Sequence, residues 1–527
     1  MRLIGSLLIT LLAMSSFPIL PTAHAEDQPA LKTTVKHVLL ISVDGLHALD
    51  LSNYIENHQE STLARLSRHG ITYTNAASSQ PSDSFPGLAA LVTAGSPTTT
   101  GFWYDDTYNR ALSPPQQTDG LGNPGGACPG KIGTNVAWDE AIDFDLTKLD
   151  GGGGINPNFL TRDPYNNCAI VMPHQYLRVN TIFEVVKANG GTTAWTDKHP
   201  SYEWTNGPSG TGVDDFYGPE INSIPVPLPQ FAGCSPVPAP DTTPDDGWTT
   251  DLQNIQCYDS LHVQAVLNQI DGYNHDRSQQ VGVPTLFGTN FQAVSVGEKL
   301  KVAGYMDVLG TPSQGLSSEL DFVDQSLGQF VEELKKQNLF DSTLIIVGAK
   351  HGQSPIDVKK RVGIGGGQPA ATIGAADAFD ISDDGSLIWL TDPSLTASVV
   401  ATLSDPSNQQ ALGIQEIFAL QSLRNKFNDP RRDQRTPDIV LKVNTGVIFT
   451  GGSKIAEHGG LNEDDVHVAL LISLPGIKHE TVKTPVTNQQ VAPTIVKALG
   501  FDPGQLQAVQ REHIRVLPFL FPDSDKD

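Results

Sequence analysis

The sequence has few cysteines, little positive charge and no long hydrophobic run after its first residues. Only four of the 527 residues are cysteines, and they do not form the close C-x-x-C pairs typical of zinc clusters. Beyond residue 12, no segment reaches membrane-spanning length without charges or prolines. The 34 Lys and Arg residues against 58 Asp and Glu residues give a net charge of −24. This charge argues against nucleic-acid polymers and anionic membrane surfaces as partners, but not against a small anionic substrate in a cationic pocket.

The N-terminal residues have the pattern of a secretory signal. Arg2 precedes the mostly apolar stretch 3–12, and Ala23-His24-Ala25 matches a small-residue cleavage site. We therefore predict that residues 1–25 are a removed signal peptide, with a retained N-terminal anchor as the alternative. A periplasmic or secreted product without a membrane span follows from this prediction, and four cysteines fit such an oxidising compartment.

The cysteines lie in or beside stretches that look like loops, where a crosslink would restrain an insertion. Four cysteines allow three connectivities. We favour the pairs Cys128–Cys168 and Cys234–Cys257.

The alternation of apolar strands and amphipathic helices predicts an α/β fold with a doubly wound, mostly parallel sheet. The predicted strands span residues 37–43, 192–195, 284–291, 300–305, 343–348, 387–390, 438–443 and 466–473. Two stretches rich in glycine or proline, at about 112–167 and 205–256, are predicted to be long loop insertions, the first of them an ordered lid. The length allows one large domain or two. We predict a single catalytic domain over residues 26–527.

Several polar residues stand near the ends of the predicted strands. Asp44 directly follows the apolar run Val38–Val43, and Ser84 stands just before a helix predicted over residues 88–94. Ligands bind at the carboxyl ends of parallel strands, and a helix N-terminus attracts anions. Asp and His suit a metal such as zinc, which activates a bound serine. Singly, such an Asp is often a helix cap and such a His a hydrogen-bonded structural residue. The candidate residues are Asp44, Ser84, Asp105, Asp197, His199, Asp307, His351 and His458.

Five short segments carry a resemblance to a known family. They are Ser42-Val43-Asp44-Gly45, Pro81–Pro86, Tyr305–Gly310, Lys350-His351-Gly352 and Glu457-His458-Gly459-Gly460. Their order and content resemble the alkaline phosphatase superfamily, most closely its branch of type I phosphodiesterases and nucleotide pyrophosphatases. The resemblance extends from about Lys36 to about Asp502.

The resemblance implies a fold of alkaline phosphatase type and a two-step displacement at phosphorus. Ser84 takes the place of the nucleophile, where many relatives have Thr, and forms a covalent intermediate that is then hydrolysed. Asp44, Asp307, His351 and His458 take the places of metal ligands. Two ions about 4 Å apart normally hold the attacking and leaving oxygens in such sites.

Two positions depart from the family pattern. Lys350 stands where the family has Asp, and Thr311, four residues after Asp307, stands where it has His. Each departure removes one metal ligand, which leaves one ion or two as alternatives, with zinc as the expected metal. In one interpretation, Lys350 replaces the lost positive charge and stabilises the phosphoryl oxygens in a single-metal enzyme, an arrangement similar to that of sulfatases.

In the other interpretation, new residues refill a metal or substrate site. Asp105, Asp197 and His199 are the candidates, and Asp105 falls where relatives carry an Asn that stabilises the transition state. For Asp197 and His199, a hydrogen-bonded turn before Pro200 is the simpler explanation.

The sequence therefore predicts an exported, metal-dependent hydrolase of small phosphate diesters, with nucleotides as one substrate class. Hydrolysis of a phosphomonoester, sulfate or phosphonate ester is the alternative within the same chemistry. A catalytically silent binding protein with a degenerate metal site is the alternative outside it. The fold alone does not choose among these functions.

Overall fold

The computed structural model describes residues 34–146, 148–223, 228, 230–231, 233–234 and 249–521. The predicted signal peptide, residues 1–25, and much of the second insertion lie outside the described residues. Among the described residues, no helix is both long and apolar enough to cross a membrane.

An eight-stranded sheet forms the centre of the molecule. Its order is β20 (Glu480–Val482), β2 (Gly70–Tyr73), β19 (Leu470–Ser473), β11 (Thr343–Gly348), β1 (His37–Val43), β10 (Leu286–Phe291), β8 (Ala194–Thr196) and β9 (Asp215–Tyr217). All neighbours pair in parallel except at β19, which runs antiparallel to both β11 and β2. The predicted mostly parallel sheet is therefore confirmed, and β1 and β11 have the predicted bounds. Central strands of this kind are buried on both faces, which explains their continuous apolar sequences.

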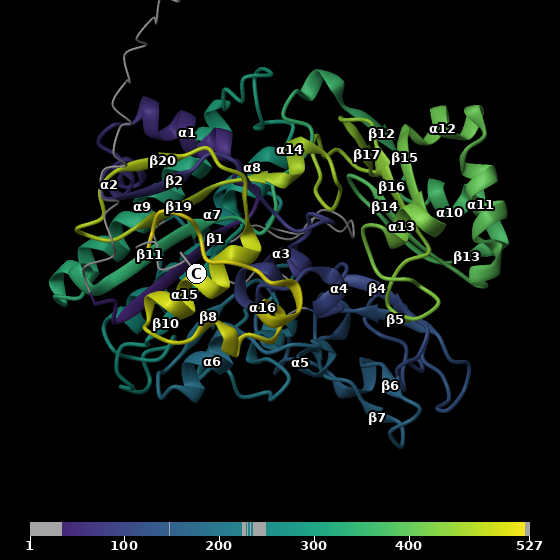
Figure 1. Ribbon diagram of the computed structural model, residues 1–527, viewed down its shortest axis with the longest axis horizontal. Helices are drawn as coiled ribbons and strands as arrows, with labels where there is room; N and C mark the ends of the chain where they lie inside the picture. Colours follow the sequence, from purple (N-terminus) through teal and green to yellow (C-terminus); the bar gives the residue numbers. More distant parts are fainter. Residues whose placement is uncertain are drawn as a thin grey trace, which may run out of the picture.

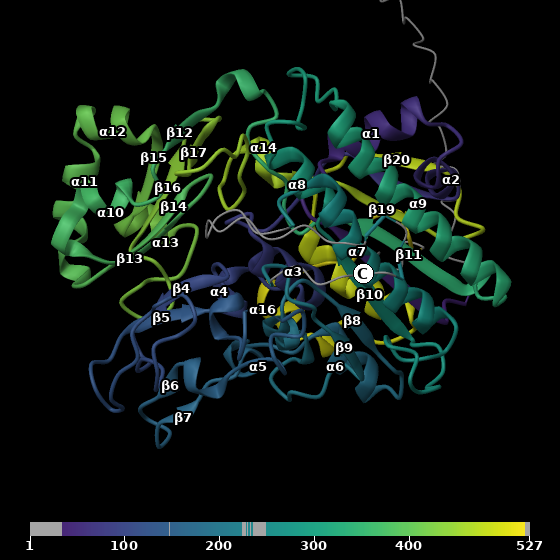
Figure 2. The same cartoon turned by 180° about the vertical axis from the view of Figure 1, so that it is seen from behind.

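Helices cover both faces of this sheet. Figure 1 shows α15 (Val491–Ala498) and α6 (Ile182–Ala188) on the near face, and Figure 2 shows α7 (Leu252–Ile270) and α9 (Gln314–Lys336) on the other. The remaining helices around the sheet are α1 (Ala48–Asn57), α2 (Thr62–Arg68), α3 (Ser84–Thr93), α4 (Pro97–Thr100), α5 (Pro173–Tyr176), α8 (Ala293–Lys299), α14 (Glu463–Val466) and α16 (Gln507–Glu512). This layering places the carboxyl ends of the parallel strands along one edge.

A second sheet lies at one end of the molecule (Figure 1). Its antiparallel order is β13 (Asp377–Ser382), β14 (Ser386–Leu390), β16 (Ile439–Val443) and β15 (Ile414–Ala419). It has its own apolar core beneath α10 (Gln368–Ile373), α11 (Thr396–Leu403) and α12 (Pro406–Leu412). Two of the predicted strands, 387–390 and 438–443, thus form this smaller sheet rather than extending the central one. A short pair, β12 (Val362–Ile364) and β17 (Val447–Phe449), flanks it.

The predicted strand 300–305 does not form. The chain leaves α8 at Lys299 and turns at Gly304, whose φ of +73° lies in the left-handed region that favours glycine. Tyr305 makes only an isolated bridge with Pro312. Residues 306–311 consequently form a turn, which matters for Asp307 below.

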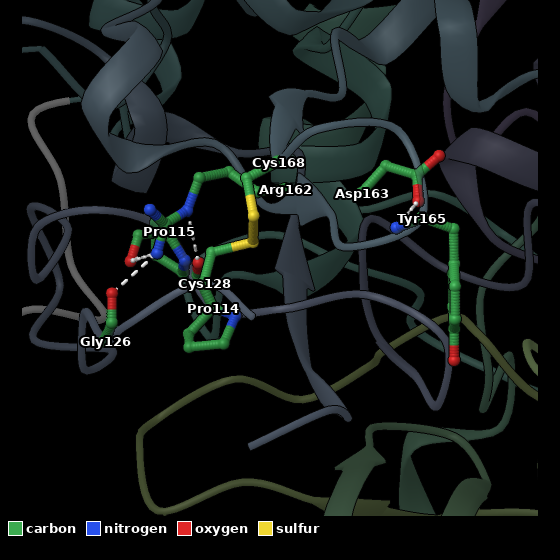
Figure 3. Close-up of a disulfide and its surroundings, with 8 residues drawn as sticks. All are labelled: Pro114, Pro115, Gly126, Cys128, Arg162, Asp163, Tyr165 and Cys168. Atoms are coloured by element: carbon green, nitrogen blue, oxygen red, sulfur yellow. Dashed lines mark hydrogen bonds between the residues drawn. A yellow bond between two sulfur atoms is a disulfide. The ribbon is translucent and has the colours of Figure 1, made fainter. Parts of the chain in front are cut away.

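The first insertion is an ordered layer beside α3 and the second sheet. Two antiparallel pairs tie it to the residues just outside its ends: β5 (Thr134–Ala137) pairs with the preceding β4 (Asp106–Asn109), and β6 (Arg162–Asp163) with the following β7 (Ala169–Ile170). The disulfide Cys128–Cys168 crosslinks it (Figure 3). Beside this crosslink, Arg162 donates hydrogen bonds to the carbonyl oxygens of Pro114, Pro115 and Gly126. These bonds satisfy backbone groups that have no partner strand.

The second disulfide joins Cys234 to Cys257 of α7, so both favoured pairings are present. It fixes the second insertion to a helix that covers the central sheet.

An ion pair connects the first insertion's C-terminal flank to the loop before β16. Arg178 donates to both carboxylate oxygens of Asp433 at 2.6 and 2.8 Å. Although burial alone would raise the pKa of Asp433, the hydrogen bonds and charge of Arg178 lower it to about 2. Because the pKa is lower in the folded chain than its unfolded value of about 3.9, the pair stabilises the fold above pH 4, and this contribution disappears as the pH falls through about 2.

We expect Asp433→Asn to lower the free energy of unfolding by about 1–2 kcal/mol at pH 7, discounted for the partial exposure of the arginine. Denaturant unfolding at a series of pH values measures this. The difference between wild type and variant should shrink between pH 4 and pH 2, and a difference independent of pH would contradict the role given to the ion pair.

Candidate active site

The carboxylate of Asp44 lies at the centre of the site, at the carboxyl end of β1. Side-chain amides from the end of the neighbouring strand β10 hold both of its oxygens. Asn290 Nδ2 donates to Oδ1 at 2.7 Å, and Gln292 Nε2 donates to Oδ2 at 2.6 Å. The parallel register of β1 and β10 brings these residues together, because Val43 pairs with Phe291. Asp44 is thereby fixed in one orientation, although it is fully buried.

Ser84 is the first residue of α3. Asp83 caps this helix by accepting a hydrogen bond from the Phe85 amide at 3.0 Å, so the helix begins four residues earlier than the predicted residue 88. Gly87 packs against the backbone of Lys350, where a Cβ atom would lie 2.2 Å from the carbonyl oxygen. This close approach, which only glycine permits, sets the N-terminus of α3 against the end of β11.

His351 follows β11 and faces both Asp44 and Ser84. Its Nε2 lies 3.4 Å from Asp44 Oδ2 and 3.2 Å from Ser84 Oγ. Its Nδ1 lies 2.8 Å from the Gly352 carbonyl oxygen, an acceptor, so Nδ1 carries the proton. Burial lowers the pKa of His351, and the ring is neutral. Nε2 and Asp44 Oδ2 are thus two acceptors that face each other, an arrangement that a cation stabilises.

Two lysines supply positive charge to the site. Lys198, after β8, donates to Ser84 Oγ at 2.9 Å and lies 3.4 Å from Asp44 Oδ2. Lys350 forms an ion pair with Asp197 at 2.9 Å, stands over the Tyr202 ring and lies 4.0 Å from Asp44. The Lys198 side chain is 13% exposed and that of Lys350 is 0% exposed. Lys198 is therefore the lysine that contacts the serine and faces solvent.

The charges of these groups are strongly coupled. Burial alone would raise the pKa of Asp44, but the charges of Lys350 and Lys198 hold it well below its usual range. Burial opposes the charge of Lys198, yet Asp44 and the neighbouring carboxylates raise its pKa above the usual value. Lys198 is accordingly an ammonium at neutral pH. It donates a hydrogen bond to Ser84 and does not act as its base.

His458 lies against His351, with the ring centroids 3.9 Å apart. Its Nδ1 is 3.6 Å from Asp83 Oδ1, and neither atom has a hydrogen-bond partner among the described residues. Burial and the neighbouring His351 hold the pKa of His458 well below its usual range, and burial together with Asp105 raises that of Asp83. A hydrogen bond from the second sheet helps to hold His458 in place. The amide of Asp384, in the turn between β13 and β14, donates to the carbonyl oxygen of His458.

Comparison with known proteins identifies the family. The family model described as type I phosphodiesterase/nucleotide pyrophosphatase matches residues 38–204 and 235–467. The chain belongs to this family. The match confirms the resemblance seen in the sequence and identifies the chain as a phosphodiesterase-type hydrolase of phosphoesters. A search of curated proteins finds no match.

Solved structures share the fold of this type I phosphodiesterase family member. Murine ectonucleotide pyrophosphatase/phosphodiesterase 5 is 12% identical with a TM-score of 0.53, covering 89% of this chain and 96% of its own. An inactive variant of it in complex with AMP matches equally well. The alkaline phosphatase PafA is 13% identical with a TM-score of 0.58, covering 88% and 96%. These likenesses confirm the alkaline-phosphatase-like architecture.

The remaining residues expected from the sequence are dispersed. Asp197 lies in the site, where it accepts hydrogen bonds from Lys350, Trp195 Nε1 and the Lys198 amide. Asp105 lies close enough to Lys198 and Asp83 to raise the pKa of both. Its own carboxylate accepts a hydrogen bond from the Asp106 amide. His199 contacts a different carboxylate, because its Nδ1 lies 2.8 Å from Glu220 Oε1.

Asp307 is not brought to this group. It lies in the exposed turn 306–311, where its Oδ1 accepts hydrogen bonds from the amides of Leu309 and Thr311. These bonds lower its pKa. Asp307 therefore stabilises a turn instead of lying at the sheet edge, because the predicted strand 300–305 that would have placed it there does not form.

The residues present fit one metal ion better than two. Asp44 Oδ2 and His351 Nε2 face each other beside Ser84 Oγ, as two ligands and a nucleophile around one ion would. No group of three His, Cys, Asp or Glu ligands converges at Ser84 among the described residues. The two lysines carry positive charge where a second ion would otherwise neutralise the carboxylates.

Lys350→Met tests whether the buried lysine balances Asp197. The substitution leaves Asp197 buried without its ion-pair partner, and we expect a loss of about 3–5 kcal/mol in the free energy of unfolding. Lys350→Met combined with Asp197→Asn should recover most of this loss. Denaturant unfolding of the single and double variants measures the coupling, and equal losses in both would contradict the pairing.

Proposed function

We propose that this family member is an exported hydrolase of small phosphate diesters that forms a covalent intermediate on Ser84. The placement of Ser84 Oγ supports the proposal most directly. It lies at the N-terminus of α3, 2.9 Å from a lysine ammonium and 3.2 Å from a neutral imidazole. Helix N-termini and ammonium groups both attract the anionic oxygens of a phosphate diester.

The chain's own residues divide the work of the first step. The Ser84 hydroxyl loses its proton to solvent and Oγ attacks phosphorus, the bond to one ester oxygen breaks, the leaving alcohol takes up a proton from water, and the remaining phosphoryl group stays on Ser84. Lys198 stabilises negative charge on the attacking oxygen and, because it is partly exposed, on the phosphoryl oxygens. Lys350 acts indirectly, since it neutralises Asp197 and Asp44 from a fully buried position. Water then hydrolyses the Ser84 ester and regenerates the hydroxyl.

A divalent ion, with zinc the first choice, would be held by Asp44 and His351. When bound, it supplies the charge of a Lewis acid, which lowers the pKa of the Ser84 hydroxyl. Asn290 and Gln292 orient the Asp44 ligand through its oxygens, as outer partners of metal ligands generally do.

The substrate class and the compartment rest on separate observations. The AMP complex of the murine neighbour's inactive variant is the reason to rank nucleotide diesters first among substrates. Both disulfides and the signal-like N-terminus support export to the periplasm or the medium.

Ser84→Ala should reduce turnover of an aryl nucleotide diester by about 10³-fold or more, because the attacking oxygen is removed. A panel with an aryl diester, monoester, sulfate and phosphonate measures the preference, and we expect the nucleotide diester to be hydrolysed fastest. Ser82→Ala is the matched control, since this neighbouring buried hydroxyl bonds Ser78 and Asp465 and forms no hydrogen bond with Ser84 among the described residues.

Full turnover by Ser84→Ala would reject the nucleophile. A preference for the monoester, sulfate or phosphonate would replace the diester assignment, and binding without turnover by the wild type would favour a silent binding protein.

His351→Asn should lose the ion at this centre, because it removes the ligand that faces Asp44. We expect turnover to disappear after chelation and to return with zinc in the wild type but not in the variant. Elemental analysis of wild type, His351→Asn and Asp307→Asn measures the ion count. Loss of the same ion in Asp307→Asn would contradict the placement of Asp307 in a turn away from the site.

A further inference from the structure

A second group of ligand-type side chains gathers around His199. Glu140 belongs to the short 3₁₀ helix Glu140–Ile142 of the first insertion, and Asp143 follows that helix. His199 precedes the 3₁₀ helix Pro200–Asn206, just after β8, and Glu220 follows β9. The ligand atoms of Glu140, His199 and Glu220 all lie within 4.8 Å of one another.

Few hydrogen-bond donors serve the carboxyl groups of this cluster. Glu220 contacts His199 Nδ1 with both oxygens, at 2.8 and 2.9 Å, and accepts a hydrogen bond from the Asn222 amide. Glu140 Oε2 accepts from Asn222 Nδ2 at 2.8 Å.

Asp143 is the decisive member of the group. Its side chain is 1% exposed, and neither carboxylate oxygen has a hydrogen-bond partner among the described residues. It contacts the Glu220 side chain, and burial together with the neighbouring Glu220 raises the pKa of Asp143 to about 10. Two buried carboxyl groups in contact are stable only if they share a proton or if a cation lies between them.

We propose that Glu140, Asp143, His199 and Glu220 form a divalent-cation site separate from the Ser84 centre. Three carboxylates and one imidazole nitrogen suit a transition-metal ion such as Mn²⁺ or Zn²⁺, because imidazole disfavours Ca²⁺ and Mg²⁺. The ion would join the first insertion, the end of β8 and the start of the second insertion. It would thereby fix the segment that carries Lys198, the residue directly before His199.

Another converging group, His47, Asp50 and Glu298, does not need an ion. His47 Nδ1 lies 2.8 Å from Asp50 and 3.3 Å from Glu298, and these carboxylates hold the pKa of His47 well above its usual range against the effect of burial. The Tyr305 hydroxyl lies 2.9 Å from Asp50 Oδ1 and 2.6 Å from Glu298 Oε1. The carboxylates there have donors beside them, whereas Asp143 has none among the described residues.

Titration of the metal-free, full-length chain with Mn²⁺ tests the proposal. Electron paramagnetic resonance counts bound Mn²⁺, and competition with Zn²⁺ ranks the two ions. We expect the Glu220→Gln and Asp143→Asn variants to bind the ion at this site at least roughly tenfold more weakly than the wild type. His351→Asn should retain it, which separates this site from the ion of the proposed catalytic centre.

Glu203→Gln is the matched control, because Glu203 also pairs with a histidine, His174, at 2.7 Å but lies outside the group. Thermal unfolding adds a readout that does not depend on activity. Without metal, Asp143→Asn should melt at or above the wild-type temperature, since it relieves repulsion, and Mn²⁺ should stabilise the wild type and Glu203→Gln but not Asp143→Asn. The proposal would be overturned if the wild type, Glu220→Gln and Asp143→Asn bound Mn²⁺ equally well. It would also be overturned if His351→Asn bound no Mn²⁺.

Discussion

The site is organised around the neutralisation of one fully buried carboxylate. Asp44 ends the central strand β1, in the interior of an eight-stranded sheet, where an uncompensated charge would be expensive. Two amides, a histidine and two lysines surround it, and each comes from the end of a neighbouring strand or from the residues just after it. The positive charges that stabilise the buried Asp44 carboxylate also attract an anionic substrate at Ser84. Stability and chemistry therefore depend on the same interaction.

The sequence predicted the parts of this arrangement that parallel strand order dictates. β1 and β11 are adjacent, so Asp44 and His351 had to meet once both strands were recognised, and α3 had to present Ser84 beside them. Lys198 was missed because its neighbours Asp197 and His199 carried the apparent metal-binding signal. Its position after β8, a strand end on the same edge, was the signal that could have identified it.

The expectations that depended on loop geometry were less secure. Asp307 matched a family motif, but its place at the sheet edge required a strand over 300–305, and the chain turns at Gly304 instead. The second sheet could not be recognised from the sequence as a separate unit. An antiparallel strand such as β14 is as continuously apolar as a strand of the central sheet. The convergence of Glu140, Asp143 and Glu220 depends on how two insertions fold over β8, which no local pattern encodes.

The central claim is that Ser84, held by Lys198, attacks the phosphate diester. The most direct measurement is rapid quenching of a single turnover with a nucleotide diester, followed by mass spectrometry of the peptide that contains Ser84. The account predicts a phosphoryl adduct on Ser84, formed at least about 10²-fold more slowly in Lys198→Met. Turnover without an adduct on Ser84, or an adduct that forms equally fast in Lys198→Met, would contradict it.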